Sequence, residues 1–209
     1  TIIQNPILYG ARLSGKVDKN WRVGLLNMQT EKDDEAGIRA QNFTVAAVQR
    51  QVFARSNIAA IFVNRESFKT DSSDRFTRVA GLDYNIQSAD NKWVGKVFYH
   101  QAFTPEKKSE QFAHAAYLGY RVRKFQLFWN HEYIGKNYDV NDIGFIRRTG
   151  VWRFEPFGEY IMYPKNKSSL LARHSVNVYY NNYKDLNFND LDRNLRFTYS
   201  MDFSNTMNI

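Results

Sequence analysis

The segment Leu195–Phe203 reads LRFTYSMDF and alternates between large apolar and polar side chains. Successive side chains of a β-strand point to opposite faces, so a period of two predicts a strand with one apolar and one polar face. The same alternation recurs in Phe112–Val122 and Phe125–Tyr133, whereas the period of an amphipathic helix is hard to find. The pattern predicts an all-β protein.

Extended along the whole chain, the alternation predicts about twelve strands. Most are about ten residues or longer, above the roughly five or six of a globular sheet. That length is close to the roughly 9–11 residues with which a tilted strand crosses a membrane. The predicted ranges are 7–17, 21–30, 43–53, 57–66, 76–88, 92–103, 111–122, 124–134, 148–155, 158–164, 170–180 and 191–203.

The predicted connections alternate between short and long. Asp18–Asn20 and Ala54–Ser56 are short, and Glu31–Asn42 and Gly135–Arg147 are long. Only the last connection, Asn181–Asp190, is long where a short turn is due. Bacterial outer-membrane barrels have short periplasmic turns and longer extracellular loops. The sequence therefore predicts an antiparallel transmembrane β-barrel in the outer membrane of a Gram-negative bacterium.

Residues 1–209 are expected to form a single domain that is part of a larger barrel. With about twelve strands and periplasmic short turns, both chain ends fall on the extracellular side, whereas whole barrels usually keep both in the periplasm. An isolated piece would also have two unpaired edges, which lipid does not tolerate. We therefore expect missing strands on both sides, odd in number on each.

Composition narrows the classes of partner. The 209 residues include no cysteine, which removes disulfides and thiolate chemistry, and no apolar stretch approaches the roughly 20 residues of a membrane helix. The net charge of +8 suits contact with outer-membrane lipid and anionic lipopolysaccharide. Because the basic residues are spread along the chain without a recognition motif, nucleic acid is not an expected partner.

Aromatic residues lie near the predicted strand ends. Amphipathic rings favour the headgroup level of a membrane, so these positions predict an aromatic girdle. Its members are Tyr9, Trp21, Phe43, Phe53, Trp93, Tyr133, Tyr163 and Phe203.

The polar faces of the strands predict a lumen lining with more basic than acidic members. Such a lining favours anions or hydroxyl-rich solutes, and the alternative is that the charges pair with one another and only fill the interior. The candidate lining residues are Arg12, Lys16, Arg22, Arg50, Arg65, Asp83, Lys96, Arg121, Glu132, Arg196 and Asp202.

No enzyme chemistry is predicted. Glu155 and Glu159 flank a predicted turn at Pro156–Phe157 and would lie on adjacent strands at the membrane edge, without the cleft that a glycosidase pair needs. The segment from Asp139 to Asp142 lacks the full spacing of a calcium loop. The sequence therefore predicts no catalytic residue, no metal and no cofactor.

Several segments carry a resemblance to a known family. They are Ile7–Val17 (ILYGARLSGKV), Trp21–Thr30 (WRVGLLNMQT), Asn42–Phe53 (NFTVAAVQRQVF), Arg55–Asn64 (RSNIAAIFVN) and Asp142–Arg148 (DIGFIRR). Together they resemble the barrel part of an outer-membrane protein family of unknown function found in Bacteroidota. The resemblance implies an exported protein in which a carbohydrate-binding-like domain of the family 9 type precedes the barrel.

The expected function is a passive or gated conduit, or a membrane anchor linked to carbohydrate handling. Two other interpretations stay open. The chain could be a structural subunit or client of a larger outer-membrane assembly, with other outer-membrane proteins as partners. It could also belong to a glycan-active surface protein whose binding or catalytic domain lies outside these residues.

Overall fold

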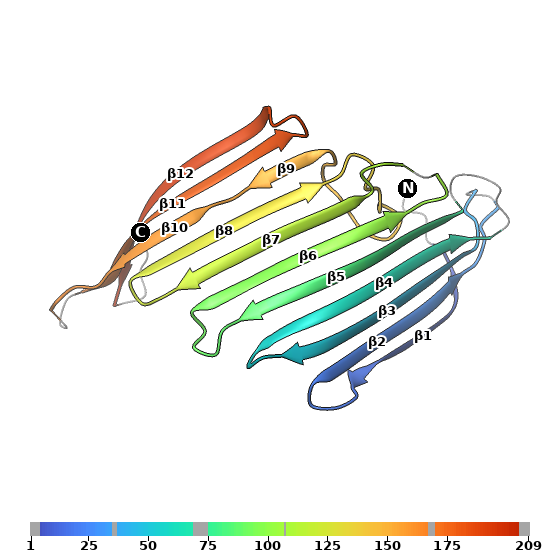
Figure 1. Ribbon diagram of the computed structural model, residues 1–209, viewed down its shortest axis with the longest axis horizontal. Coiled ribbons are helices and arrows are strands. Elements are labelled where there is room, and N and C mark those ends of the chain that lie inside the picture. The colour runs from blue at the N-terminus through green and yellow to red at the C-terminus, as the bar shows by residue number, and fades with distance from the viewer. Residues whose placement is uncertain (1–4, 35–36, 69–74, 107, 167–169, 205–209) are drawn as a thin grey trace.

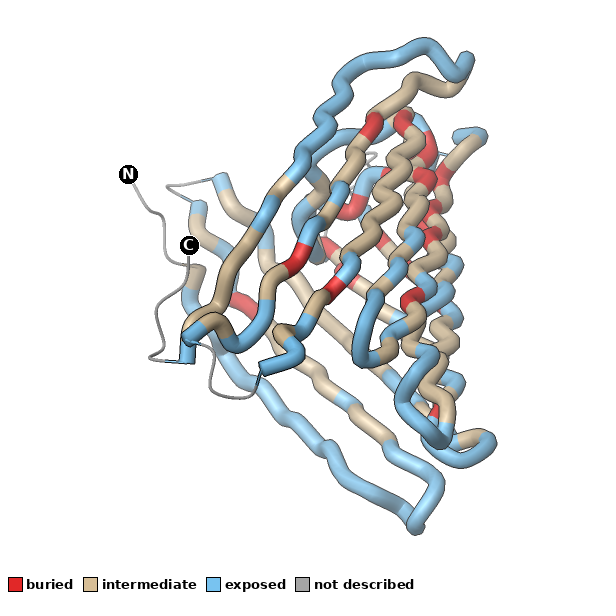
Figure 2. The backbone as a smooth tube through the Cα atoms, turned by 90° about the vertical axis from the view of Figure 1, so that its left-hand side faces the viewer, coloured by how far each residue is buried: buried red, intermediate tan, exposed pale blue. Residues whose placement is uncertain are grey.

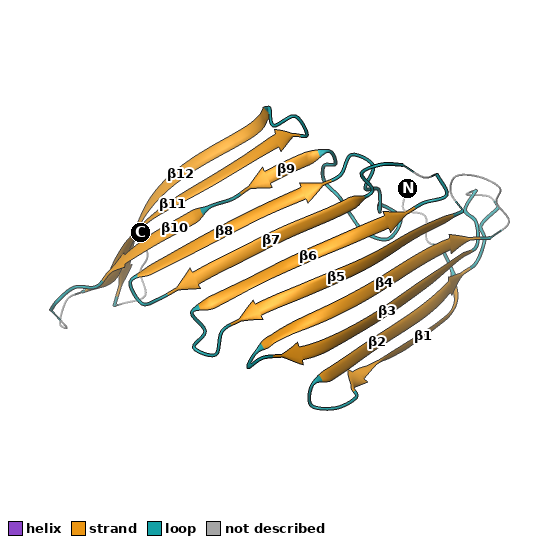
Figure 3. Cartoon of the chain, viewed as in Figure 1, coloured by secondary structure: helices purple, strands orange, loops and turns teal. Residues whose placement is uncertain are grey.

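In the computed structural model, the chain forms one antiparallel sheet of twelve strands (Figures 1 and 3). The structure describes residues 5–34, 37–68, 75–106, 108–166 and 170–204. None of these residues is in a helix that is long and apolar enough to cross a membrane. The strands are β1 (Ile7–Lys16), β2 (Trp21–Thr30), β3 (Gln41–Val52), β4 (Ser56–Ser67), β5 (Phe76–Gln87), β6 (Trp93–Phe103), β7 (Phe112–Arg121), β8 (Phe125–Ile134), β9 (Val151–Phe154), β10 (Phe157–Met162), β11 (Leu171–Asp185) and β12 (Asp190–Phe203).

The predicted all-β class is confirmed, and each predicted range overlaps one observed strand. The largest difference is in β11, which continues to Asp185, so the predicted long connection Asn181–Asp190 is wrong. The polar run looks like a loop, but its side chains bond to the neighbouring strand. Asn182 donates its side-chain N–H to the carboxylate of Asp190 at 3.0 Å, so this polar residue bonds across the hairpin instead of lying in a loop.

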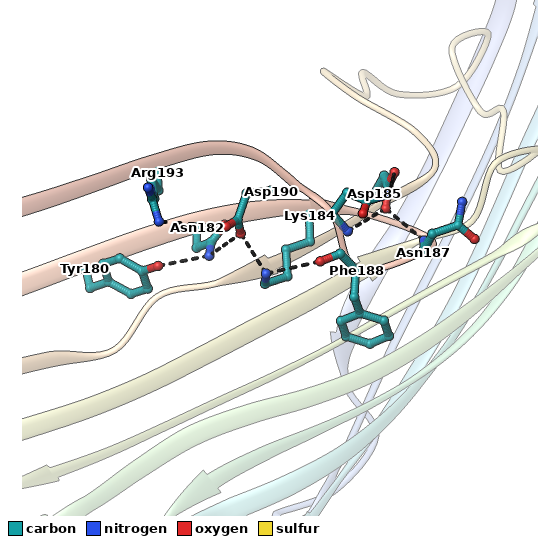
Figure 4. Close-up of polar contacts among 9 residues, drawn as sticks. Tyr180, Asn182, Lys184, Asp185, Asn187, Phe188, Asp190 and Arg193 are labelled. Atoms are coloured by element: carbon teal, nitrogen blue, oxygen red, sulfur yellow. Dashed lines mark hydrogen bonds and ion pairs between the residues drawn. The ribbon is translucent and has the colours of Figure 1, made fainter.

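The β11–β12 turn is closed by its own side chains (Figure 4). The carboxylate of Asp185 accepts the backbone N–H groups of Asn187 and Asn189, each at 2.8 Å. The ammonium of Lys184 reaches the carbonyl of Phe188 at 3.2 Å, and Phe188 itself has a φ of 64°. Asp and Asn bond the backbone two residues on in this way and so stabilise tight turns.

Strands β9 and β10 are two halves of one row of the sheet. Both pair with β8 on one side and with β11 on the other. Between them, Glu155 still exchanges backbone hydrogen bonds with Asn130, at 2.8 and 3.3 Å. Pro156 has no N–H to donate and interrupts the ladder there. The predicted turn at Pro156–Phe157 is therefore wrong, and the twelve strands occupy eleven rows.

An odd number of rows changes the predicted orientation of the ends. The first row begins at the end of the sheet that carries the connection 135–150, and the last row finishes at the end that carries the turn 122–124. The expectation that the first and the last strand have their free ends on one side is therefore wrong, and so is the argument for an odd number of strands after the last one. The turns 17–20, 53–55, 88–92 and 122–124 share one end, hereafter the short-turn end. The opposite end is the long-loop end, although its last connection is the tight turn 186–189.

The sheet is curved and open. Figure 2 shows it bending into an arc, with the β1–β2 and β11–β12 hairpins turning toward the same side. Within the described part of the chain, β1 pairs only with β2 and β12 only with β11. These two edge strands are largely exposed along their length. The sheet thus resembles a section of a curved wall with a concave inner face and a convex outer face.

Burial identifies which side chains point inward. Residues that pair in register share a face, and side chains crowd together on the concave side of a curved sheet. Ala102 is 0% exposed and Arg65 is 3% exposed, and both belong to one face. Leu82 on the other face is 63% exposed. The first set defines the inner face and the second defines the outer face.

The outer face is apolar across its middle. At the long-loop end this apolar band stops at a network of amides, in which Asn27 donates to Asn42 at 3.0 Å and to Thr44 at 2.8 Å. Large exposed apolar residues of the outer face are Leu13, Leu25, Val48, Ile58, Phe62, Leu82, Val97, Leu118, Leu127, Tyr160, Val176, Leu195 and Phe197.

Gly135 marks the point where the chain leaves β8. A Cβ at this position would lie 2.1 Å from the backbone oxygen of Glu110, which cannot move without breaking the neighbouring connection. We expect Gly135→Ala to lower the free energy of unfolding by about 1–3 kcal/mol, as overpacking does. Urea titration of the purified protein measures the change. The control is Gly24→Ala, because a Cβ at Gly24 has nothing within 4 Å. Equal stability of the two variants would contradict the close approach.

Candidate functional site: the inner face and the loop that crosses it

Ten of the eleven predicted lining residues lie on the inner face. Their pairing partners place them in register with the buried residues described above. They are Arg12, Lys16, Arg22, Arg65, Asp83, Lys96, Arg121, Glu132, Arg196 and Asp202.

Arg50 is the exception and lies on the outer face. Its register partners are Trp21 and Ile58, and its guanidinium is 5.3 Å from the centroid of the Trp21 ring. The prediction fails because β3 is apolar on both faces: Val45 points inward and Val48 outward. Alternation therefore does not reveal which face of this strand is which.

The predicted aromatic girdle is divided between the two ends of the sheet. Trp21, Phe53, Trp93, Tyr163 and Phe203 lie at the short-turn end, and Tyr9, Phe43 and Tyr133 lie toward the long-loop end. Phe43 differs from the others because it pairs with Arg65 and so lies on the inner face. Tyr133 packs between Phe112 and Trp152, with ring centroids 5.0 and 4.8 Å away.

Five of these ten lining residues form an ion pair: Arg65, Asp83, Lys96, Glu132 and Asp202. Asp83 lies between the Lys96 ammonium and His100 Nε2, each 2.9 Å from a carboxylate oxygen. Asp202 forms an ion pair with Arg173 of the adjacent strand. These charges pair with one another, as the filling interpretation of the interior predicts.

A second network surrounds Arg153 on β9. Its guanidinium contacts Glu155 and lies 3.4 Å from a carboxylate oxygen of Glu132. Glu155 also accepts the hydroxyl of Tyr179 at 2.5 Å and the side-chain N–H of Asn130 at 2.8 Å. The carboxylate of Glu155 is therefore engaged in a structural network.

Glu155 and Glu159 do not lie on adjacent strands as predicted. They belong to the same row, four residues apart, because Pro156 interrupts a strand instead of turning it. At about 3.3 Å per residue, their Cα atoms are about 13 Å apart. The observed arrangement therefore differs from the predicted one, in which the two residues lie on adjacent strands at the membrane edge.

The remaining lining cations have no carboxylate partner among the described residues: Arg12, Lys16, Arg22, Arg121 and Arg196. Two of them instead lie over aromatic rings. The guanidinium of Arg121 is 4.7 Å from the Phe128 ring centroid, and that of Arg196 is 5.7 Å from the Tyr179 ring centroid. The inner face therefore combines a neutralised centre with uncompensated positive charge elsewhere.

The connection of residues 135–150, hereafter the crossing loop, folds onto the inner face at the long-loop end. In Figure 1 it passes behind the ends of β7 and β6. Tyr138 and Val140 are 7% and 8% exposed and pack against Val79, Ala102 and Ala113 of β5, β6 and β7. Small side chains on these strands leave room for the loop, which therefore has its own apolar core.

A polar contact fixes the far side of the crossing loop. The Asp142 carboxylate lies 3.0 Å from Nη2 of Arg65 and accepts the Thr77 hydroxyl at 2.9 Å. Arg65 on β4 is 3% exposed, so its charge is compensated within the protein. Beside this contact lies a polar hollow of about 620 Å³, lined by Thr77, Thr104, Gln111, Lys136, Asn137 and Asp142 among others.

Two exposed connections carry carboxylates with shifted pKa values. In the β5–β6 turn, the Ser88 hydroxyl donates to Asp90 at 2.7 Å, and with the Lys92 ammonium it lowers the pKa of this carboxyl well below its usual range. In the β6–β7 connection, the Lys108 ammonium lies 2.8 Å from Glu106 and lowers its pKa. Both connections therefore keep their charge in mild acid.

Residues 3–209 match a family model described as Domain of unknown function (DUF5916). The chain belongs to this family. No curated protein and no solved structure matches the chain. The DUF5916 match spans all twelve strands together with the crossing loop, so the loop is part of the family domain.

The crossing loop of this DUF5916 domain is what the sequence interpretation missed. The predicted long connection Gly135–Arg147 corresponds closely to it, but its inward fold was not foreseen. The apolar composition of the loop could have indicated this fold, because a solvated loop does not need so many large apolar side chains. They are Tyr138 and Val140, which belong to the buried cluster, and Ile143 and Ile146, which pack against it. Asp142, for which the sequence offers a weak calcium pattern as the one chemical role, instead pairs with Arg65.

The contact between Asp142 and Arg65 can be tested by proteolysis. Asp142→Ala removes the ion pair and one hydrogen bond, which we expect to raise the open population of the loop about tenfold, or ~1.4 kcal/mol. Trypsin cleavage after the exposed Arg147 measures that population. The control is Asp139→Ala, because Asp139 bonds only within the loop, to Asn141. Equal cleavage rates in the two variants would refute the proposed role of the contact.

Proposed function

We propose that this domain forms part of the wall of an outer-membrane β-barrel, with its outer face against lipid and its inner face lining an aqueous path. The observation that carries the proposal is the division of the sheet into an apolar convex face and a polar concave face. Phe197 and Leu82 on the convex face are 69% and 63% exposed. A large exposed apolar surface marks a contact with lipid or with another protein.

The dimensions of the sheet suit this role. A ten-residue strand is about 34 Å long, and a tilt of about 40° reduces its height to about 26 Å, close to the apolar band of such barrels. Trp21 and Trp93 bound the apolar band at the short-turn end, and the amide network around Asn42 bounds it at the other. Indole rings favour the membrane interface, which supports a lipid-facing band between these limits.

The crossing loop gives the proposed path a constriction. It extends from β8 across the inner ends of β7 and β6 to β5 and β4, where Asp142 meets Arg65. A segment that lies on the inner face reduces the space available to a solute. The uncompensated cations of that face favour anions or hydroxyl-rich solutes, so the proposed conduit selects by size and by charge.

The unpaired edges favour a second candidate function. Edge strands with free N–H and C=O groups are not tolerated in lipid, so β1 and β12 require neighbours within a membrane. Strands from elsewhere in the polypeptide would give a single-chain barrel. Strands from another subunit would make the domain a component of a larger outer-membrane assembly. In both arrangements we propose that lipid and lipopolysaccharide surround the wall, and that it can anchor a carbohydrate-handling domain.

The lipid contact can be tested with single cysteines, since the chain has none of its own. Leu127 is 53% exposed on the outer face, and its neighbour Gln126 is half-buried on the inner face. In outer-membrane fractions we expect a membrane-impermeant maleimide to label Gln126→Cys at least tenfold faster than Leu127→Cys, because lipid excludes the reagent.

The same two cysteine variants also test the alternative to a lipid contact. A sheet surrounded by water would give the opposite order, because Leu127 is the more exposed residue. A lipid-soluble maleimide provides the control, and it should label Leu127→Cys readily. Faster labelling of Leu127→Cys by the impermeant reagent would overturn the proposal.

The conduit can be tested by conductance in planar bilayers. Replacement of residues 136–149 by a short Gly-Ser turn removes the crossing loop, and we expect a several-fold higher conductance for small ions because the path widens. Asp139→Ala keeps the contact between Asp142 and Arg65 and should conduct like the unmodified protein. An unchanged conductance after loop replacement would contradict the constriction.

A further inference from the structure

We infer that Lys16, Lys19, Arg22 and Arg55 form a binding site for a phosphate- or sulfate-bearing ligand at the short-turn end of the inner face. The site is a hollow of about 380 Å³ between the turns 17–20 and 53–55 and the adjoining ends of β2, β3 and β4. Its walls are these four cations together with neutral polar side chains and one alanine, and no carboxylate lines it. One part of the inference rests on the proposed function, namely the direction from which the ligand arrives.

Two of the cations are held side by side by the backbone. Lys16 and Arg22 are direct register partners in β1 and β2, and both point to the inner face. Like charges in this position repel each other. Among the described residues no ion pair with a carboxylate relieves this repulsion; Asp18, the nearest carboxylate in the sequence, instead accepts the backbone N–H groups of Asn20 and Trp21 at 2.6 and 2.8 Å. The pair is therefore suited to an external anion.

The other two cations come from the turns that border the hollow. Lys19 belongs to the same turn as Asp18, and Arg55 belongs to the β3–β4 turn. The guanidinium of Arg55 donates to the side-chain carbonyl of Asn91, which orients the side chain. Positive charge thus converges on one hollow from two separate connections, and a concave site concentrates the field of such charges.

Several other cations of the inner face are compensated by carboxylates. Arg65 has Asp142, Lys96 has Asp83, and Arg153 has Glu132 and Glu155. The four cations around the hollow have no such partner among the described residues. Arg12, Arg121 and Arg196 have none either, but they lie apart on β1, β7 and β12 and do not line this hollow. A hollow with compensated charge would suit a neutral solute, and this one suits an anion.

Size and neutral lining indicate the chemical class of the ligand. The hollow is larger than a single phosphate ion, and Gln49 and Asn57 offer amide donors and acceptors beside the cations. Arginine binds oxyanions with two parallel N–H donors, and amides suit hydroxyl groups. A phosphate or sulfate ester of a hydroxyl-rich molecule fits both features. Such an ester can come from a small soluble solute or from a phospholipid headgroup.

Titration calorimetry of the full chain in detergent at low salt tests the site. The probes are glucose 6-phosphate, phosphatidylglycerol, and glucose as the uncharged comparison. We expect at least one phosphate ester to bind, and the double variant Lys16→Gln/Arg22→Gln to weaken that binding at least tenfold. Glucose should bind much more weakly. The ester that binds identifies the source of the ligand, and added salt should weaken its binding by screening.

Arg50→Gln is the matched control, because Arg50 is close to Arg22 in the paired strands but lies on the outer face. It should leave binding unchanged. Equal weakening by the control and the double variant, glucose binding as tight as that of its phosphate, or no binding of either ester would overturn the inference. Because binding in detergent needs no membrane path, its failure is distinguishable from failure of the cysteine-labelling test.

Discussion

Continuous antiparallel pairing is the constraint on which the other features of this sheet depend. Each row between the two edge strands takes its backbone hydrogen bonds from two neighbours, and side chains have a period of two along a strand. The register between β1 and β2 therefore determines the face of every later residue, through a ladder that continues to β12. Register places Lys16 beside Arg22 and separates Arg50 from both. Backbone pairing thus decides which residues lie on the inner face and which on the outer face, whatever their side chains are.

The sequence predicts the strands well because most rows have one apolar and one polar face, as in Phe125–Tyr133. It fails where that difference disappears. In β3, apolar residues occupy both faces, so Arg50 was given the wrong side. Pro156 suggests a turn, but its lost hydrogen bond is a local interruption in a row that Glu155 continues. Because Pro156 was interpreted as a turn, the predicted sheet had twelve rows in place of eleven, and both ends of the chain were expected on one side.

The long-range part of the candidate site could not be read from the sequence. Alternation says which way a side chain points but not what lies above it, so the partners of Arg65 and of Ala102 were out of reach. Those partners come from the crossing loop, roughly forty to eighty positions away along the chain. Short-range interactions were more accessible: the bonds of Asp18 and Asp185 to their own turns follow from residues two to four positions apart.

The crossing loop leaves the sheet after β8 and returns at the adjacent row, β9. An insertion or deletion within it therefore shifts no hydrogen bond of the ladder, since β8 and β9 stay in register whatever the loop length. The wall and the segment that spans its hollow can vary independently in evolution. Engineering has the same freedom: the reach of the loop can be lengthened, shortened or chemically altered while the scaffold that carries it keeps its sequence.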